Sequence, residues 1–256
     1  MSIILSGACG RMGQAVARQA LQEGFEILFG VDPRGESVSF PVFSSFGDVN
    51  LPVKPQDVII DFSAPAALPD LLNFAVANDL PCILASTGYT QEQLDAITMA
   101  SASIPVFRSA NMSLGIAVLK VLAQKAASVL YPAGFDIEIV EAHHGKKKDA
   151  PSGTALLLLD GIRQCPGLEN LRRKDGRSGL EGERPRDEIG MHALRGGTVA
   201  GEHEVCFFGP MERLKLSHSA EDRAVFAQGA LRAAAFMQGK APGLYSMDDL
   251  VAGMNL

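Results

Sequence analysis

Residues 138–155, which read EIVEAHHGKKKDAPSGTA, combine an alternating strand pattern, two histidines and three lysines with a PSGT stretch that opens an apolar run. The N–H groups of a helix start, a hydroxyl and a nearby ammonium together suit a carboxylate. Histidines placed among lysines and carboxylates can exchange a proton near pH 7. We therefore expect this segment to bind an anion and to donate a proton. The candidate residues are His143, His144, Lys147, Ser152, Gly153 and Thr154.

Two other interpretations of this segment stay open. A triple lysine taken alone is more often a solvated charged turn. The adjacent histidines could instead ligate a metal, but neighbouring residues of a strand point to opposite faces, and the segment supplies no evident third ligand. We therefore predict a site without metal.

A second group of candidate residues lies in the stretch GACGRMG, between a short buried-type strand and a helix. Gly7, Gly10 and Gly13 suit a tight turn, close approach of a pyrophosphate and an open helix start. The spacing departs from the strict G-x-G-x-x-G fingerprint because Ala8 stands where a glycine is usual. Asp32 ends the next strand, where a ribose-binding carboxylate is expected. The alternative is a purely structural turn.

Alternating strand and helix patterns surround these glycines and predict a parallel sheet of Rossmann type. The predicted strands are 2–7, 25–32, 57–63, 81–87 and 104–109, and the predicted helices are 11–24, 65–79 and 90–103. Small and polar residues follow several of these strands, at the edge where doubly wound folds bind ligands.

The pattern changes after a long apolar helix predicted over 110–130. Alternating strands are expected at 135–144, 188–197, 200–209 and 212–220, and the last three are expected to be antiparallel around glycine turns. We predict an α/β chain whose second, α+β domain has a mixed or largely antiparallel sheet. The charged, glycine-rich segment 166–187 is interpreted as a mobile loop or lid. The expected division is a dinucleotide-binding domain of residues 1–112 and 223–256, and a substrate-binding and oligomerisation domain of residues 113–222.

Composition indicates an ordinary soluble protein, because 47% of the residues are apolar and 20% are charged. A net charge of −6 argues against nucleic acid or an anionic membrane as partner. The four cysteines lack CxxC spacing, which favours free thiols and a cytoplasmic location. No apolar run approaches the roughly 20 residues of a membrane span.

The segment 138–155 resembles the signature E-[IV]-x-E-x-H-x-x-x-K-x-D-x-P-S-G-T-A of the dihydrodipicolinate reductase family. The stretches GACGRMG, IIDFS, STG, SANMSLG, RGGTVAGEH and LSHSAEDRAVFAQGAL also resemble family landmarks, in the same order. The resemblance implies NAD(P)H-dependent reduction of 4-hydroxy-tetrahydrodipicolinate, a small dicarboxylate, in the diaminopimelate route to lysine. It also implies a homotetramer, and the alternating apolar residues of 135–142 and 188–219 favour assembly through that sheet.

The resemblance also implies roles for single residues. It makes His143 and Lys147 the proton donors, and it assigns the substrate carboxylates to His144, Lys147, Gly153 and Thr154. The implied dinucleotide contacts are Gly7, Ala8, Cys9, Gly10, Arg11, Met12, Asp32, Ala85, Ser86, Thr87, Ser109, Ala110, Asn111 and Met112. Cys9 and Ala85 replace commoner glycines, and Met112 stands where a phenylalanine is frequent.

The choice of coenzyme depends on the stretch VDPRG. The Asp32 carboxylate suits a ribose diol and repels a 2′-phosphate, whereas an arginine can pair with that phosphate. Pro33 occupies the place where an arginine is common in the family, and Arg34 follows one residue later. We predict that NADH is used at least as well as NADPH, and that NADPH is accepted only as far as the candidate contact Arg34, one residue too late in sequence, can reach over the adenine edge.

Two rival functions remain. One is another Rossmann-type amino-acid or sugar dehydrogenase, and the other is an NAD(H)-binding redox regulator without turnover. Neither explains a histidine and lysine cluster joined to a helix start, and a regulator would also need a basic DNA-reading helix.

Overall fold

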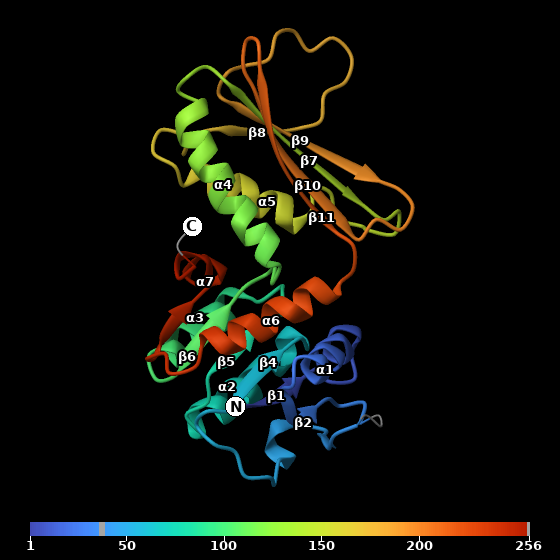
Figure 1. Cartoon of the computed structure of the whole chain (residues 1–256), viewed down its shortest axis with the longest axis vertical. Coiled ribbons are helices and arrows are strands. Elements are labelled where there is room, and N and C mark those ends of the chain that lie inside the picture. Colours follow the sequence, from blue (N-terminus) through green and yellow to red (C-terminus); the bar gives the residue numbers. More distant parts are fainter. Residues whose placement is uncertain (36–38, 255–256) are drawn as a thin grey trace. The chain divides into compact units, whose positions relative to one another are not determined.

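The computed structural model describes residues 1–35 and 39–254, and the chain divides into two compact units (Figure 1). The first unit comprises Met1–Leu114 and Arg223–Leu256, and the second comprises Gly115–Asp222. Each unit has its own sheet and its own apolar core.

The first unit contains a parallel sheet whose strand order, within the described residues, is β12-β6-β5-β4-β1-β2-β3. The order in which successive strands are added to the sheet reverses at β1, because β2 pairs on one side of β1 and β4 on the other. Ligands of doubly wound sheets bind beyond the carboxyl ends of the strands at such a reversal. The strands are β1 (Ser2–Ser6), β2 (Glu26–Val31), β3 (Val42–Phe43), β4 (Val58–Asp61), β5 (Cys82–Leu84), β6 (Pro105–Arg108) and β12 (Gly243–Tyr245).

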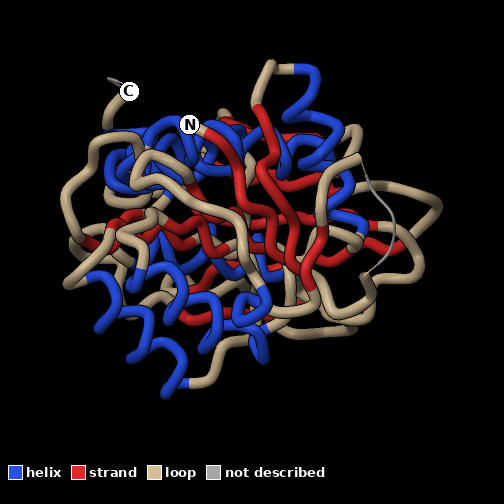
Figure 2. Tube along the Cα trace, turned by 90° about the horizontal axis from the view of Figure 1, so that it is seen from below, coloured by secondary structure: helices blue, strands red, loops and turns tan. Residues whose placement is uncertain are grey.

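Helices flank this sheet, as the blue and red segments of the tube trace show (Figure 2). Helix α1 packs against α6, while α2 packs against α3. Right-handed crossovers that run in opposite directions from β1 put these two pairs on opposite faces. The helices are α1 (Arg11–Gln22), α2 (Leu68–Ala77), α3 (Gln91–Ser101), α6 (Ala224–Phe236) and α7 (Met247–Ala252), and short 3-10 turns lie at Phe46–Asp48 and Pro65–Ala67. The predicted Rossmann-like parallel sheet is confirmed.

The second unit contains a mixed sheet with the order β11-β10-β7-β9-β8. Strand β10 runs antiparallel to β7 and β11, whereas β9 runs parallel to β7 and β8. The mixed sheet is confirmed, but the expectation that β9 is antiparallel is wrong, because two crossovers, the helix after β7 and the segment 176–187 after β8, each return the chain to the same end of the sheet. The strands are β7 (Asp136–His143), β8 (Arg172–Asp175), β9 (Glu188–Arg195), β10 (Gly201–Phe208) and β11 (Arg213–Ala220).

Helices α4 (Leu114–Leu130) and α5 (Gly153–Arg163) cover one face of this sheet. Ile137 and Ile139 of β7 pack in the core beneath these helices. Because strand side chains alternate, Glu141 and His143 continue the same face toward the start of α5. Glu138 lies on the opposite face, which we call the outward face.

The segment 166–187 is not one irregular loop. Arg172–Asp175 form strand β8, which pairs with β9. Arg177 and Arg184 both donate hydrogen bonds to Glu138 on the outward face. The loop prediction is therefore wrong for β8, whose RRKD sequence has the charged character of an edge strand rather than an alternating apolar pattern.

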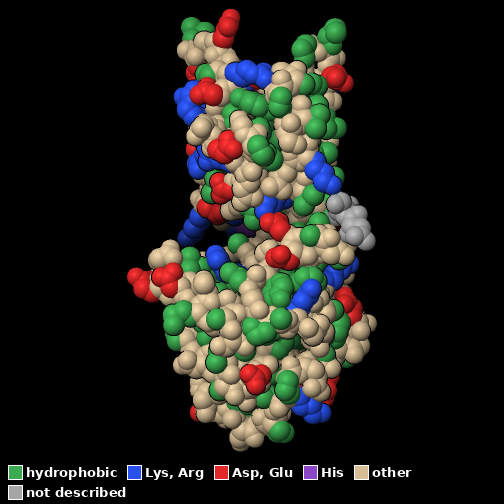
Figure 3. Space-filling view, turned by 90° about the vertical axis from the view of Figure 1, so that its left-hand side faces the viewer, with side chains coloured by type: hydrophobic (Ala, Val, Ile, Leu, Met, Phe, Trp, Pro, Cys, Tyr) green, Lys and Arg blue, Asp and Glu red, His purple; other side chains and the backbone are tan. Residues whose placement is uncertain are grey.

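Among the residues that the structure describes, the surface charges, the cysteines and the helix lengths give no sign of a further specialised site. Acidic and basic side chains are interspersed on the face shown in Figure 3. All four cysteines are buried thiols. Within the described part of the chain, no helix combines the length and apolar character needed to cross a membrane.

Candidate active site

His143 ends strand β7 and is held by a carboxylate two residues earlier. Its Nδ1 lies 2.6 Å from Oε2 of Glu141. Burial would raise the pKa of Glu141, but hydrogen bonds from Arg195, His143 and the Ser152 N–H outweigh burial and lower it. An ionised carboxylate only accepts hydrogen bonds, so Nδ1 of His143 carries the proton.

Glu141 joins three separate segments. Arg195, at the end of β9, donates from Nη1 to Oε2 and from Nη2 to Oε1, both at 2.7 Å. The backbone N–H of Ser152, just before α5, donates to Oε1 at 3.0 Å. Glu141 therefore links β7 and β9 to the start of the helix, and its side chain is almost fully buried.

Ser152 caps helix α5, since its Oγ accepts the N–H of Ala155 at 3.2 Å. The same oxygen lies 3.1 Å from Nε2 of His203, which comes from β10. The rings of His203 and His143 meet edge to face, with centroids 5.1 Å apart. Burial, with a smaller contribution from His143, lowers the pKa of His203 to about 4, so this ring is neutral at pH 7.

Lys147 lies in the connection between β7 and α5, where its Nζ pairs with Oδ2 of Asp149 at 2.9 Å. The Asp149 side chain is well exposed and that of Lys147 is half-buried, so the cation sits at the edge of the cluster. His144 donates its backbone N–H to Val199. Its Nδ1 is buried and has no hydrogen-bond partner among the described residues.

The sequence-predicted residues of the second unit therefore share one connection. His143, His144, Lys147, Ser152, Gly153 and Thr154 all lie between the end of β7 and the first turn of α5. Sequence reasoning did not find Arg195 or His203. His203 carried a usable signal, because it shares the inward face of β10 with the core residues Val205 and Phe207.

The glycine turn between β1 and α1 has no room for side chains at two positions. Gly7 has a φ of +76°, and a Cβ there would lie 2.7 Å from the Phe62 carbonyl oxygen. A Cβ on Gly13 would lie 2.2 Å from the oxygen of Gly7. Gly10 precedes α1 and leaves that helix start without a side-chain cap. This cradle fits a pyrophosphate.

Asp32 follows β2 and is buried beside the turn. Its carboxylate accepts the N–H of Cys9 at 3.0 Å and pairs with Nε and Nη2 of Arg34 at 2.9 and 2.7 Å. The Arg34 side chain, assisted by backbone N–H groups, lowers the pKa of Asp32 despite burial. Arg34 therefore reaches the carboxylate although it comes one residue after Pro33.

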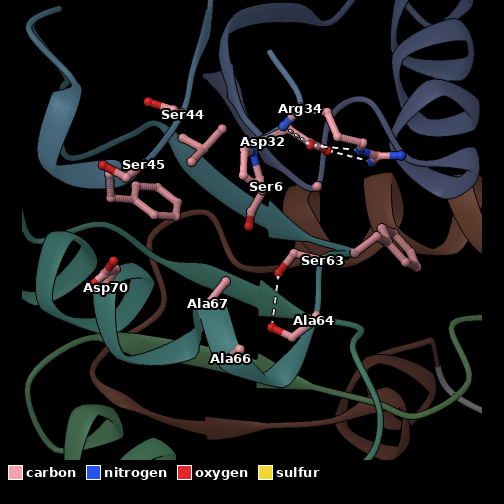
Figure 4. Close-up of a pocket in the computed structure, with 15 residues that line it drawn as sticks. Ser6, Asp32, Arg34, Ser44, Ser45, Ser63, Ala64, Ala66, Ala67 and Asp70 are labelled. Carbon is pink, nitrogen blue, oxygen red and sulfur yellow. Dashed lines mark hydrogen bonds and ion pairs between the residues drawn. The ribbon is translucent and has the colours of Figure 1, made fainter. Parts of the chain in front are cut away.

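A cavity of about 430 Å³ opens between the end of β2 and the segment after β4 (Figure 4). Its walls include apolar side chains such as Val31, Phe46 and Phe62, with Asp32 and Arg34 at one side. Cavities with apolar walls and a few polar groups suit a heterocycle carrying polar substituents. The dimensions and lining fit the adenosine half of a dinucleotide.

The carboxyl ends of β4, β5 and β6 hold the remaining predicted residues of the first unit. Buried Asp61 accepts hydrogen bonds from Ser63 Oγ at 2.5 Å and Ser86 Oγ at 2.8 Å. The predicted residues Ala85, Ser86 and Thr87 follow β5, and Ser109, Ala110, Asn111 and Met112 follow β6. Sequence reasoning noted the DFS stretch but did not single out Asp61.

A close backbone contact was also missed by sequence reasoning. A Cβ on Gly229 of α6 would lie 1.6 Å from the Met112 carbonyl oxygen, so only glycine lets this helix approach.

Within residues 1–35 and 39–254, no group of three histidine, cysteine, aspartate or glutamate side chains has the arrangement of a metal site.

Comparison with known proteins identifies the family. "Dihydrodipicolinate reductase, N-terminus" matches residues 1–112, and "Dihydrodipicolinate reductase, C-terminus" matches residues 115–251. The 4-hydroxy-tetrahydrodipicolinate reductases of Caldanaerobacter subterraneus and Clostridium novyi are 48% and 44% identical to this chain, over 97% and 99% of both sequences.

A solved structure shows the same fold. The dipicolinate-bound dihydrodipicolinate reductase from Paenisporosarcina sp. TG-14 has a TM-score of 0.79 at 22% identity, covering 96% of this chain and 98% of that one. Full-length identity and both domain matches agree. The chain belongs to the dihydrodipicolinate reductase family.

Proposed function

We propose that this chain is an oxidoreductase that reduces 4-hydroxy-tetrahydrodipicolinate to tetrahydrodipicolinate with NAD(P)H, in the diaminopimelate route to lysine. One observation carries the proposal: a histidine and a lysine lie directly before the capped start of α5, in a chain of this family. That arrangement combines proton donation with carboxylate binding.

In this proposal the second unit binds the substrate. The first turn of α5, at Ser152, Gly153 and Thr154, receives one carboxylate, and His144 and Lys147 neutralise negative charge. A substrate carboxylate would compete with Asp149 for the Lys147 ammonium. The dipicolinate bound by the Paenisporosarcina relative supports a small dicarboxylate as ligand class.

In this proposal His143 or Lys147 donates the one proton that the reaction consumes, and the 4-hydroxyl group of the substrate leaves as water. With Nδ1 of His143 bonded to Glu141, Nε2 is the ring nitrogen that can act on the substrate. Lys147 can donate from an ammonium that already lies beside the helix start. The dinucleotide, when bound, supplies the hydride.

The first unit would bind that dinucleotide. The proposed contacts are Gly7, Ala8, Cys9, Gly10, Arg11, Met12, Asp32, Arg34, Ala85, Ser86, Thr87, Ser109, Ala110, Asn111 and Met112. The crowded glycine turn and the cavity beside Asp32 support this assignment.

We further propose that NADH is used at least as well as NADPH. The Asp32 carboxylate suits the ribose diol, and the guanidinium beside it lets some NADPH be accepted. Comparing kcat/KM for both coenzymes tests this at one salt concentration. A preference for NADPH above about tenfold, or roughly 1.4 kcal/mol, would contradict it. Arg34→Ala should shift the ratio further toward NADH.

A homotetramer is proposed to form through the outward face of the second unit, and a cytoplasmic location also stays a prediction. That face exposes Leu194 and Phe208, and the helices that pack on the sheet lie on its other side. Sedimentation at micromolar concentration tests the assembly, and a monomer would contradict it.

Coenzyme oxidation tests the central proposal. NADH absorbance should fall only when 4-hydroxy-tetrahydrodipicolinate is present. Activity with an amino acid or sugar instead would favour the rival dehydrogenase. Coenzyme binding without turnover on any of these substrates would favour the regulator.

A further inference from the structure

We propose that Glu141 is a positioning residue of the reductase site. With Arg195 as its counter-ion, it keeps the proton of His143 on Nδ1 and holds that ring in register with the start of α5. The inference rests on the proposed function, in which His143 is a proton donor.

The contacts of Glu141 differ from those of an ordinary buried ion pair. One guanidinium satisfies both of its oxygens, and Arg195 also donates to the Asp149 carbonyl at 2.7 Å. The remaining two bonds come from His143 and from the Ser152 N–H. A single carboxylate thus joins the proposed proton donor to the proposed carboxylate-binding turn.

The direction of the bond to His143 follows from charge. A carboxylate facing a guanidinium and two further donors is ionised, so it can only accept from the imidazole. The neutral ring then has an unprotonated Nε2, and the protonated ring has an Nε2–H directed away from Glu141. Either way, the nitrogen that exchanges a proton is fixed.

A glycine in the neighbouring strand leaves space beside that nitrogen. A Cβ at Gly201 of β10 would lie only 3.1 Å from Nε2 of His143. Glycine at this position therefore keeps a side chain away from the nitrogen that Glu141 does not use.

Glu141→Gln tests the inference, and Glu138→Gln is its matched control. Glu138 is also a buried carboxylate of β7 bonded to arginine and histidine, but it lies on the outward face. Both variants are expected to lose stability. Only Glu141→Gln should disturb His143, because one amide oxygen replaces two acceptors and the amide N–H₂ opposes the donors around it.

The first readout is spectroscopic. Nitrogen-15 NMR of histidine-labelled protein at a pH where the ring is neutral reports which ring nitrogen carries the proton, and a His143→Gln spectrum assigns the signal. We expect one Nδ1–H form in the wild type and in Glu138→Gln, and a mixture or the Nε2–H form in Glu141→Gln.

The second readout is kinetic. Replacing the carboxylate that orients a catalytic histidine by an amide can lower kcat by up to about 10⁴-fold, so kcat should fall by at least about tenfold in Glu141→Gln. KM for the coenzyme should not change. In Glu138→Gln, compared at equal oligomeric state, kcat should stay within about twofold of the wild type, well below that loss.

An unchanged His143 tautomer together with an unchanged kcat in Glu141→Gln would overturn the inference and leave Glu141 a structural role. If that variant does not fold, Arg195→Lys keeps the charge but loses the two-pronged contact, and the same two readouts apply. If His143→Gln retains full kcat, the proposed function of His143 fails, while the tautomer measurement still decides whether Glu141 positions the ring.

Discussion

Strand β7 carries two buried carboxylates on opposite faces, and their surroundings differ in one respect. Glu138 accepts hydrogen bonds from Arg177, Arg184 and His192 on the outward face. Glu141 accepts from Arg195, His143 and the start of α5. Both are charged and well paired, so burial and pairing alone do not distinguish a site from a scaffold.

The two carboxylates differ in the role of the residues that donate hydrogen bonds to them. The arginines on Glu138 come from the segment that follows β8, and Arg177 also pairs with Glu188, so this network fastens a connection to the sheet. The partners of Glu141 include a ring whose second nitrogen is left for chemistry. A functional carboxylate is therefore recognised by a hydrogen-bond partner that can itself act on a substrate, as His143 can.

The largest expected effect lies on the inner side of this comparison. Lys147→Ala should lower kcat by roughly 10²–10⁴-fold if the ammonium is a general acid, and it should also weaken substrate binding. Steady-state kinetics with saturating coenzyme measure both. Lys148→Ala is the matched control, because that exposed neighbour should leave kcat near the wild-type value. A variant Lys147→Ala with unchanged kcat and raised KM would move the acid role to His143.

The two faces of the second sheet should lose stability differently as the pH falls. The larger loss of unfolding free energy is expected from Glu138 on the outward face. Burial would raise the pKa of Glu138, but hydrogen bonds from Arg177, His192 and Arg184 outweigh it and lower the pKa from 4.5 to about 2. A carboxyl with a depressed folded pKa stabilises the protein above pH 4.5 and loses that contribution as the pH falls toward 2. The loss should be about 3 kcal/mol.

Urea unfolding measured between pH 6 and pH 2.5 tests this expectation. Glu138→Gln should be less stable than the wild type at neutral pH and should lose less on acidification. Parallel curves for the two proteins would show that the network on the outward face is not charged as described.

The inner face should respond in a higher pH window. Burial and the neighbouring His143 lower the pKa of His203 from 6.5 to about 4. The unfolded chain therefore binds more protons between these values, so stability falls as the pH drops from 6.5 to 4. At pH 5 this proton uptake should have lowered the free energy of unfolding by about 2 kcal/mol relative to pH 7. His203→Gln should flatten this part of the unfolding profile, and an unchanged slope from pH 7 to pH 5 would contradict the assignment.

The smallest effect is expected on the same segment that Glu138 anchors. Arg172 and Asp187 form a two-pronged ion pair, but both side chains are mostly exposed. Exposed pairs contribute at most about 1 kcal/mol, and salt screens them. Arg172→Ala should therefore leave the urea midpoint of unfolding close to the wild-type value, and a clear fall would show that the pair belongs to the Glu138 network.

Local sequence patterns predicted much of this arrangement. Alternating strands and helices indicated the parallel sheet. The glycine spacing together with Asp32 indicated the turn at the carboxyl end of β1. His143 through Thr154 are close in sequence, so their grouping at the start of α5 was visible before any fold was known.

Contacts between distant segments were not predictable in the same way. Arg195 and His203 come from later strands, 54 and 62 residues after Glu141, and only the register of β9 and β10 brings them to Glu141. Strand β8 lacks an apolar pattern because it is a charged edge strand. Arg34 was judged by its distance in sequence from Asp32, whereas its long side chain folds back onto the carboxylate.

The most direct test of the proposed reaction follows the hydride itself. NADH carrying deuterium at C4 of the nicotinamide is incubated with the protein and 4-hydroxy-tetrahydrodipicolinate, and the product is analysed by mass spectrometry and NMR. The account predicts tetrahydrodipicolinate with one deuterium on a ring carbon, formed in step with oxidised coenzyme. Coenzyme oxidation without deuterium in the product, or no oxidation with this substrate, would contradict it.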